Sequence, residues 1–296
     1  MVVLDRILCP IDFSDTSRHA LQHAAAVARW YDAQLTVLHV FTPPYIPPVV
    51  SSPEVLRAAV PTDVGMQLRD RAGAWLAAVG EGLKAEVAVV MGPAMSSILD
   101  RAKSMSADLI VIGTHGHSGL DRLLLGSVAE RVLRKATCPV MTVPPPAGPP
   151  HALPYTRLLC AVDFSPASLS AARYALAIAR EADARLTLLH VVEWPEQDEI
   201  VEIDAELDEY RRFREERAQR ELSALVPKGE PAWCETATLL EHGRVWPTIL
   251  RVAETEHADL LVMGVHGRNV VDLTLFGSTT NQVIRHAPCA VLTLRQ

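Results

Sequence analysis

The chain has 296 residues, which suits two domains of ordinary size, and 49% of them are hydrophobic, which is enough to build a core in each. The formal net charge of −7 argues against general binding to nucleic acid or anionic membranes, because both need a basic surface. No apolar stretch reaches the length of a membrane span and the N-terminus lacks the pattern of a secretory signal, so a cytoplasmic protein is expected.

The first half of the chain alternates between strand and helix patterns. A run of branched apolar residues at 6–11 predicts a strand that is buried on both faces. A turn and helix-capping sequence follows at 12–15, and small or apolar residues then recur with helical spacing as far as Tyr31. The further expected elements are strands at 34–40, 86–90, 108–112 and 140–143, helices at 64–80, 96–104 and 126–135, and a proline-rich loop at 43–61.

This alternation predicts an α/β domain with a parallel sheet, helices on both faces and right-handed crossovers. In such sheets, ligands bind at the carboxyl ends of the strands, near the point where the strand order reverses.

The second half repeats the first. The sequence ILCPIDFS at 7–14 returns as LLCAVDFS at 158–165, and ADLIVIGTHG at 107–116 returns as ADLLVMGVHG at 258–267, both with the same shift of 151 residues. A proline-rich stretch at 144–154 joins the copies and favours neither a helix nor an inner strand. The predicted organisation is a first domain at 1–146, a linker at 147–154 and a second domain at 155–296.

The halves differ after their second strands. Residues 193–225 replace the proline-rich loop with a long helix of mixed charge. We interpret it as a solvated face supported by pairs three and four residues apart, with a partner-binding surface as the alternative.

The cysteines are interpreted as free thiols. Cys9, Cys138, Cys160 and Cys289 lie beside short apolar runs, which favours buried cysteine over a disulfide or metal framework. Cys234 falls outside this pattern and has no assigned role.

A glycine motif follows the fourth strand in both copies. It reads Gly-x-x-Gly, nine residues, then Gly-Ser, at 113–127 and again at 264–278. Glycine lets the backbone approach a ligand closely, and the last Gly-Ser opens a helix whose free N–H groups suit phosphate. The alternative is that these glycines only end the strand and start the helix, as glycines commonly do, and bind no ligand.

An aspartate ends the first strand in both copies. Asp12 and Asp163 could accept hydrogen bonds from ribose hydroxyls, as carboxylates do in dinucleotide-binding folds. The alternative is that Asp12, with Ser14, merely caps the following helix.

With these motifs, both halves resemble the universal stress protein domain, whose pattern is Gly-x-x-Gly, nine residues, Gly-[Ser/Thr], with an early strand ending in aspartate. The chain resembles a tandem member of that family. The resemblance implies two Rossmann-like, adenine nucleotide alpha hydrolase-like domains, each with five parallel strands in the order 3-2-1-4-5. It also implies binding of ATP, AMP or ADP, with Mg²⁺ as a candidate companion ion.

The resemblance also implies site residues. The first-strand aspartates would meet ribose or adenine, the ends of the second strands would meet adenine, and the glycine motifs would hold ribose and phosphates. The implied residues are Pro10, Ile11, Asp12, Val40, Gly113, Gly116, His117, Gly126, Ser127 and Val128 in the first half, and Ala161, Val162, Asp163, Val191, Gly264, Gly267, Arg268, Gly277, Ser278 and Thr279 in the second.

One difference between the halves concerns phosphate. His117 of the first loop becomes Arg268 in the second, and arginine is always charged and can grip phosphate with two bonds. We therefore expect the second site to hold a triphosphate at least as well as the first.

The resemblance also implies pairing of the last strands of two domains, here 140–143 with 291–294 within one chain, which would cover two sheet edges. A homodimer is a further candidate assembly. Nucleic acid and membrane are not expected partners.

No catalytic set is predicted, and the chain has no G-x-x-x-x-G-K-[ST] loop. His115 and His266 are interpreted as positioning their loops. His19 and His23, four residues apart on a helix, are interpreted as a surface pair without a third metal ligand. The predicted function is a nucleotide-binding sensor or regulator in a stress response. The alternatives are a slow ATP hydrolase and a structural stress protein whose pocket is empty or holds lipid.

Overall fold

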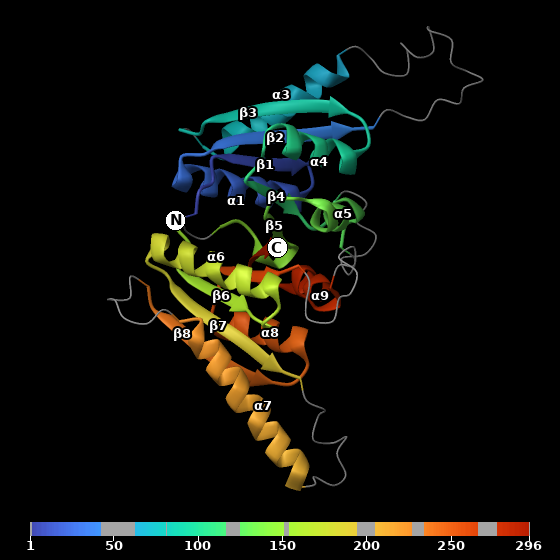
Figure 1. The fold of residues 1–296 in the computed structure, drawn as a ribbon. Coiled ribbons are helices and arrows are strands. Elements are labelled where there is room, and N and C mark those ends of the chain that lie inside the picture. Colours follow the sequence, from blue (N-terminus) through green and yellow to red (C-terminus); the bar gives the residue numbers. More distant parts are fainter. Residues whose placement is uncertain are drawn as a thin grey trace, which may run out of the picture. The chain divides into compact units, whose positions relative to one another are not determined.

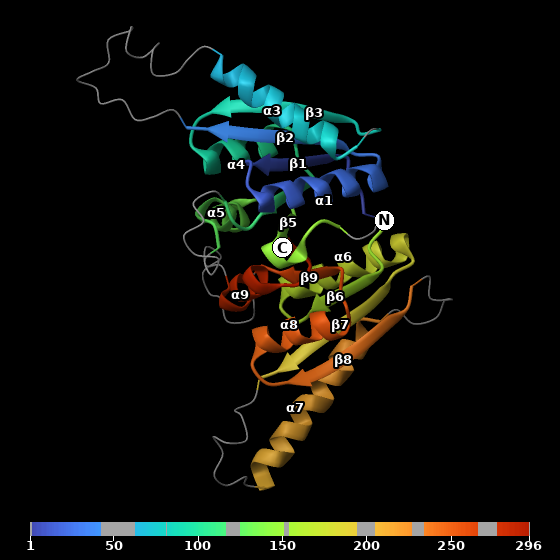
Figure 2. The ribbon, with the colours of Figure 1, turned by 180° about the vertical axis from the view of Figure 1, so that it is seen from behind.

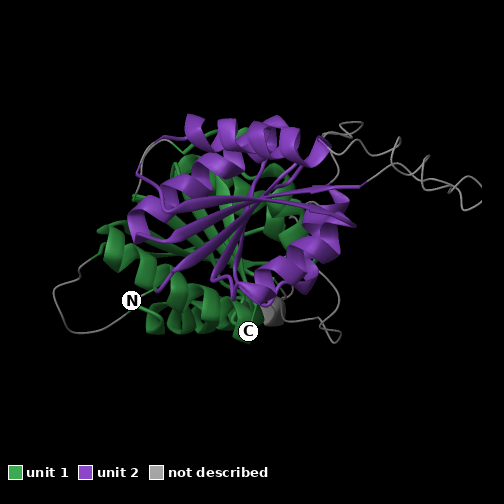
Figure 3. Ribbon diagram, turned by 90° about the horizontal axis from the view of Figure 1, so that it is seen from above, with its two compact units in different colours: residues 1–2, 146–296 green, residues 3–145 purple. Residues whose placement is uncertain are grey.

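The computed structural model describes residues 2–42, 63–80, 82–116, 125–150, 154–193, 205–226, 234–265 and 277–295. The chain forms two compact units, drawn in purple and green in Figure 3. The N-terminal unit comprises residues 3–145, and the C-terminal unit comprises residues 146–296 together with residues 1–2.

The N-terminal unit contains a parallel sheet of five strands in the order β3-β2-β1-β4-β5 (Figure 1). This confirms the predicted order 3-2-1-4-5. All residues of β1 except the first are buried, as the run of branched apolar residues predicted. The strands are β1 (Arg6–Ile11), β2 (Gln34–Phe41), β3 (Ala85–Met91), β4 (Leu109–Gly113) and β5 (Val140–Val143).

Helices cover both faces of this sheet (Figure 2). On one face α1 packs beside α3, where the Arg18 guanidinium lies 4.8 Å from the centre of the Trp75 ring. On the other face α4 contacts α5. The helices are α1 (Asp15–Tyr31), α3 (Val64–Ala78), α4 (Ala94–Ser104) and α5 (Ser127–Lys135).

The C-terminal unit repeats this arrangement with the strand order β8-β7-β6-β9-β10. None of the helices in the described ranges of the two units is long and apolar enough to cross a membrane. The strands are β6 (Arg157–Ala161), β7 (Arg185–Val192), β8 (Thr236–His242), β9 (Leu260–Gly264) and β10 (Ala290–Leu294), and the helices are α6 (Pro166–Ala182), α7 (Ala205–Ala224), α8 (Val245–Thr255) and α9 (Ser278–His286).

The proline-rich stretch contains a short helix that the sequence did not predict. This is η2 (Pro145–Ala147), a single 3-10 turn. Proline tolerates the first turn of a helix because the N–H groups there have no partner within the helix, so one turn forms where a longer helix could not.

Helix α7 lies in the charged segment of the second repeat and takes the place that α3 has in the first, between the second and third strands. It carries the expected pairs, with Arg211 Nε 3.0 Å from Glu215 Oε1 and Arg217 Nε 2.7 Å from Glu221 Oε1. It also has a buried side, because Ala218 lies on the inner face against the sheet. Residues 194–204, the start of the predicted helix, lie outside the described residues.

All five cysteines are free thiols, as predicted. Cys234, which had no assigned role, is buried like Cys9 and Cys160. Burial raises the pKa of Cys160 to about 12 and that of Cys289 to about 12, so both thiols stay protonated near neutral pH and act as apolar packing groups.

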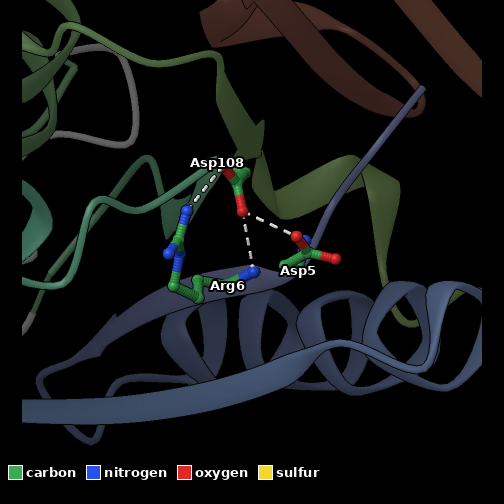
Figure 4. Close-up of polar contacts among 3 residues, drawn as sticks. All are labelled: Asp5, Arg6 and Asp108. Carbon is green, nitrogen blue, oxygen red and sulfur yellow. Dashed lines mark hydrogen bonds and ion pairs between the residues drawn. The ribbon is translucent and has the colours of Figure 1, made fainter.

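A carboxylate joins the starts of two neighbouring strands in each unit. Asp108, just before β4, accepts the backbone N–H of Asp5 at 3.0 Å and that of Arg6 at 2.9 Å through the same oxygen (Figure 4). In the C-terminal unit, Asp259 accepts the N–H of Arg157 at 3.0 Å in the equivalent way. These bonds fix β1 beside β4, and so fix the crevice at the opposite ends of the two strands.

We expect Asp108→Ala to lower the free energy of unfolding by about 1 to 2 kcal/mol, because two backbone N–H groups lose a charged acceptor. The adjacent Arg6–Asp108 ion pair, at 3.5 Å and exposed, adds little. Urea unfolding measures the loss. Asp100→Ala, on an exposed position of α4, is the control and should change stability by less than about 0.5 kcal/mol. Equal effects of the two substitutions would contradict the proposed role of Asp108.

Candidate functional site

A cavity opens at the carboxyl ends of the strands in the N-terminal unit. Strand β2 lies on one side of β1 and β4 on the other, so the chain order reverses between β1 and β4 and leaves a crevice there. The cavity has a volume of about 310 Å³, within the range of small-molecule sites. Its lining includes Pro10, Ile11, Asp12, Val40, Gly113, Gly116, Gly126, Ser127 and Val128.

The C-terminal unit has the equivalent cavity, with a volume of about 520 Å³. Its lining includes Ala161, Val162, Asp163, Val191, Gly264, Gly277, Ser278 and Thr279. The structure thus brings these sequence-predicted residues together around one cavity per unit. Their roles as ligand contacts stay predictions.

Three of the implied site residues lie outside the described residues. They are His117 of the first half and Gly267 and Arg268 of the second. His266 and the proline-rich loop at 43–61 lie outside them as well. The expectation that Arg268 favours a triphosphate in the second site therefore stays a prediction from the sequence.

Asp12 lines the cavity, and its carboxylate stabilises the turn that follows it. Its Oδ1 accepts the backbone N–H of Ser14 at 3.0 Å and also the Ser14 hydroxyl. The helix cap is a different residue, since Ser14 Oγ accepts the N–H of Ser17 at 3.2 Å. Asp12 thus supports the capping residue Ser14, and its role toward a ribose stays a prediction. Its Oδ2 lies so close to Gly116 that a Cβ there would be 2.5 Å away, so any other residue at this position would displace the carboxylate.

The residue after each aspartate has a strained backbone. Phe13 has φ of 65° and Phe164 has φ of 62°, values that bulky residues rarely adopt. Both rings pack against a histidine, with centroid separations of 4.5 Å to His39 and 4.6 Å to His190. The strain recurs at the same place in both units, where it turns the chain sharply beside the cavity.

A buried histidine supports each of these turns, and the sequence analysis missed both. His39 Nδ1 lies 2.9 Å from the carbonyl oxygen of Ile11, and His190 Nδ1 lies 2.7 Å from that of Val162. A carbonyl can only accept, so each Nδ1 carries the proton. The available signal was the recurrence of LTVLHV as LTLLHV, which places a histidine near the end of the second strand in both copies.

His39 makes the stability of the N-terminal unit depend on pH. Burial lowers the pKa of His39, against the opposing effects of the Ile11 carbonyl and Asp12. The unfolded chain then binds a proton more readily than the folded chain, so stability present above about pH 6.5 is lost as the pH falls. The loss has a limiting slope of about 1.4 kcal/mol per pH unit. We expect His39→Asn, which keeps a donor for Ile11, to remove this part of the dependence. Parallel urea-unfolding profiles of parent and variant between about pH 7 and about pH 5 would contradict it.

Helix α5 begins at the cavity with its backbone amides uncapped. Its N-cap is Gly126, and no side chain in the described part of the chain caps the helix, whereas α1 is capped by Ser14. Helix α9 begins at Gly277 in the same way, with φ of −58° and ψ of 136°. Uncapped N–H groups with a partial positive charge form an anion site, so each cavity has one end suited to phosphate.

The first glycine of each motif leaves room for a neighbouring helix, a role that the sequence did not reveal. A Cβ on Gly113 would lie 2.8 Å from the backbone carbonyl carbon of Thr16, and one on Gly264 would lie 2.8 Å from the backbone nitrogen of Ser168. These glycines let the first helix of each unit approach the end of the fourth strand. They line the cavity, but their lack of a side chain serves helix packing first.

The sequence pattern that defines the Universal stress protein family matches residues 4–144 and, a second time, residues 154–295. The chain belongs to the universal stress protein family.

Relatives match either the whole chain or one half. A universal stress protein of Mycolicibacterium smegmatis is 27% identical over 299 residues, covering 98% of this chain and 96% of that protein. Universal stress protein MJ0531 of Methanocaldococcus jannaschii is 34% identical over 146 residues, covering 48% of this chain and 82% of that protein. A crystal structure of a universal stress protein from Archaeoglobus fulgidus DSM 4304 aligns with a TM-score of 0.65 at 22% identity over 98% of both chains, which supports the fold alone.

In both universal stress protein domains, residues outside the glycine motif also line the cavity. Helix α4 contributes Ala94 and Ile98 to the first cavity, and α8 contributes Val245 and Ile249 to the second. In each helix the two residues are four positions apart and begin two residues after a glycine that recurs in both copies, a signal that could have found them.

The structure also describes the surroundings of three histidines that the sequence had singled out, His115, His19 and His23. His115 Nδ1 lies 2.8 Å from Thr114 Oγ1, and the His115 carbonyl accepts the hydroxyls of Thr16 and Ser14, which agrees with positioning of the loop. The interpretation of His19 and His23 as a surface pair is wrong for His23, which is only 3% exposed. Helix α1 is flanked by both the sheet and α3, so its buried face is wider than one apolar stripe.

Proposed function

We propose that each unit binds an adenine nucleotide (ATP, ADP or AMP) and that this occupancy makes the protein a sensor or regulator in a stress response. The observation that carries the proposal is the uncapped start of α5 and of α9 at one end of a cavity. A carboxylate, Asp12 or Asp163, stands at the strand end in the same cavity.

The chemistry of the two cavities suits a nucleotide. The amides at Ser127 and Val128 would donate to phosphate oxygens, and the amides and hydroxyls of Ser278 and Thr279 would do so in the second unit. Asp12 and Asp163 would accept hydrogen bonds from ribose hydroxyls. Mg²⁺ would enter with a triphosphate, since it prefers phosphate oxygens and water to an all-protein site.

Other parts of the proposal concern assembly and location. Pairing of the last strand of one domain with that of the other, within a chain or between two chains of a homodimer, would protect sheet edges. A cytoplasmic location belongs to the same proposal. Membership of the universal stress protein family supports the regulatory role.

The experiment is to denature freshly purified protein and identify any released small molecule by mass spectrometry. The depleted protein is then titrated with ATP, ADP and AMP by calorimetry. We expect an adenine nucleotide in the extract or two binding events per chain in the titration. Neither nucleotide in the extract nor binding at millimolar ATP would refute the proposal. Phosphate release from bound ATP measures the alternative of slow hydrolysis.

A further inference from the structure

Helix α7 directs an arginine into the second cavity. Arg214, Ala218 and Leu222 follow one another at intervals of four residues and therefore share one face of the helix. Ala218 is 6% exposed and Leu222 is fully buried, so this face packs against the sheet. Towards its N-terminus, α7 runs past the ends of β7 and β8 (Figure 1). There the same face presents Arg214, which lines the cavity beside Val191 and Glu193.

Arg214 differs from the arginines near it. Arg211 is paired with Glu215 at 3.0 Å and Arg217 with Glu221 at 2.7 Å, both along the helix surface. Within the described ranges, no hydrogen bond or ion pair engages the guanidinium of Arg214. The N-terminal cavity has no lysine or arginine among its described lining residues, so this cation distinguishes the two sites.

The sheet order places Arg214 at one end of the cavity and the phosphate-binding amides at the other. Strand β7 lies on one side of β6, and β9, which leads to α9, lies on the other side. A ligand with phosphate at Ser278 and ribose at Asp163 therefore extends its base toward Val191 and Arg214. This step rests on the proposed nucleotide function.

We propose that Arg214 contacts the base of the nucleotide in the C-terminal unit, with its planar guanidinium stacked on the purine ring. Arginine stacks well on aromatic faces because its charge is delocalised and weakly hydrated. Among the described residues the contact belongs to the second site alone, because α3, which takes the place of α7 in the first repeat, contributes no residue to the lining of the first cavity. It gives the two sites of one chain different affinities for the base.

The test compares Arg214→Gln with Arg212→Gln in the intact chain. Arg212 is two positions away, exposed, and absent from the cavity lining, so its substitution removes the same charge from a different side of the same helix. Calorimetric titrations use adenosine, AMP and ATP. We expect Arg214→Gln to weaken one of the two sites about tenfold for all three ligands, and Arg212→Gln to change neither site. Ser278→Pro is expected to weaken ATP binding in the C-terminal unit. In a chain that also carries this substitution, Arg214→Gln should leave the ATP affinity of the N-terminal site unchanged.

Three outcomes would overturn this inference. A loss that grows from adenosine to ATP would place the guanidinium on the phosphates. Equal losses in the two glutamine variants would indicate a general charge effect, and no loss would mean that Arg214 makes no contact. All three leave the proposed function standing, because the parent chain still binds nucleotide. Failure of the parent chain to bind any of the three ligands would instead refute the proposed function.

Discussion

Ser127→Pro is expected to weaken ATP binding in the N-terminal unit by about tenfold or more, while the unit stays folded. The substitution removes the backbone N–H at the first position of α5, one of the groups proposed to hold phosphate. A hydrogen bond to a charged acceptor contributes about 1.5 to 3 kcal/mol, which corresponds to at least about tenfold in affinity.

The local backbone is suited to this proline. The first position of a helix favours proline because its N–H makes no bond within the helix. The preceding residue must be extended, and Gly126 has φ of −56° and ψ of 133°. Gly277, before Ser278, has nearly the same angles, so Ser278→Pro is the parallel variant for the C-terminal unit.

Ser127→Ala is the control, since it removes the hydroxyl and keeps the N–H. It should weaken ATP binding less than Ser127→Pro does, and adenosine binding should change little in either variant. Calorimetry gives the affinities, and urea unfolding checks that the proline variant is folded. A folded Ser127→Pro chain with two ATP sites of parental affinity would contradict the phosphate role of α5.

Gly113→Ala is expected to lower the free energy of unfolding of the N-terminal unit by about 2 kcal/mol, the usual cost of overpacking a tight site. The new Cβ would lie 2.8 Å from the carbonyl carbon of Thr16 and 3.0 Å from the nitrogen of Ser17. Both contacts are with backbone at the start of α1, which cannot rotate away as a flexible side chain would. Helix α1 or strand β4 must therefore shift.

Gly73→Ala makes the same chemical change with the opposite expected sign. Gly73 lies inside α3, and a Cβ there meets nothing within 4 Å. Alanine should raise the stability by up to about 1 kcal/mol, because it is the better helix former. Urea unfolding followed by tryptophan fluorescence compares the two variants. A Gly113→Ala chain as stable as the parent would show that α1 does not constrain the end of β4.

Local patterns predicted the framework well. The bounds of β1 and β5 agree with the expected 6–11 and 140–143, because branched apolar runs with turn residues at both ends leave little freedom. Helix α3 ends two residues earlier than expected, at Ala78, and β4 extends to Gly113. Helix and strand ends depend on tertiary contacts, such as the approach of α1 to Gly113, that no local pattern encodes.

The site was predictable where topology alone determines it. Parallel strands bring their carboxyl ends to one edge, so Asp12, Val40 and the glycine motif meet there although they are far apart in sequence. His39 was missed because its role depends on the pairing of β1 with β2, which sets it opposite Ile11. Arg214 was missed because the sequence of α7 differs from that of α3, its counterpart in the first repeat. Which face of α7 meets the sheet is set by the packing of the helix and cannot be read from the local sequence.

The most direct measurement is the response of individual backbone amides to ATP and to adenosine. In isotope-labelled protein, nuclear magnetic resonance can follow Ser127 and Val128 at the start of α5, and Ser278 and Thr279 at the start of α9. We expect ATP to shift all four amide signals strongly, and adenosine to shift them much less, because only phosphate reaches the helix N-termini. Saturating ATP that perturbs other residues and leaves these four amides unmoved would contradict phosphate binding at the two helix starts.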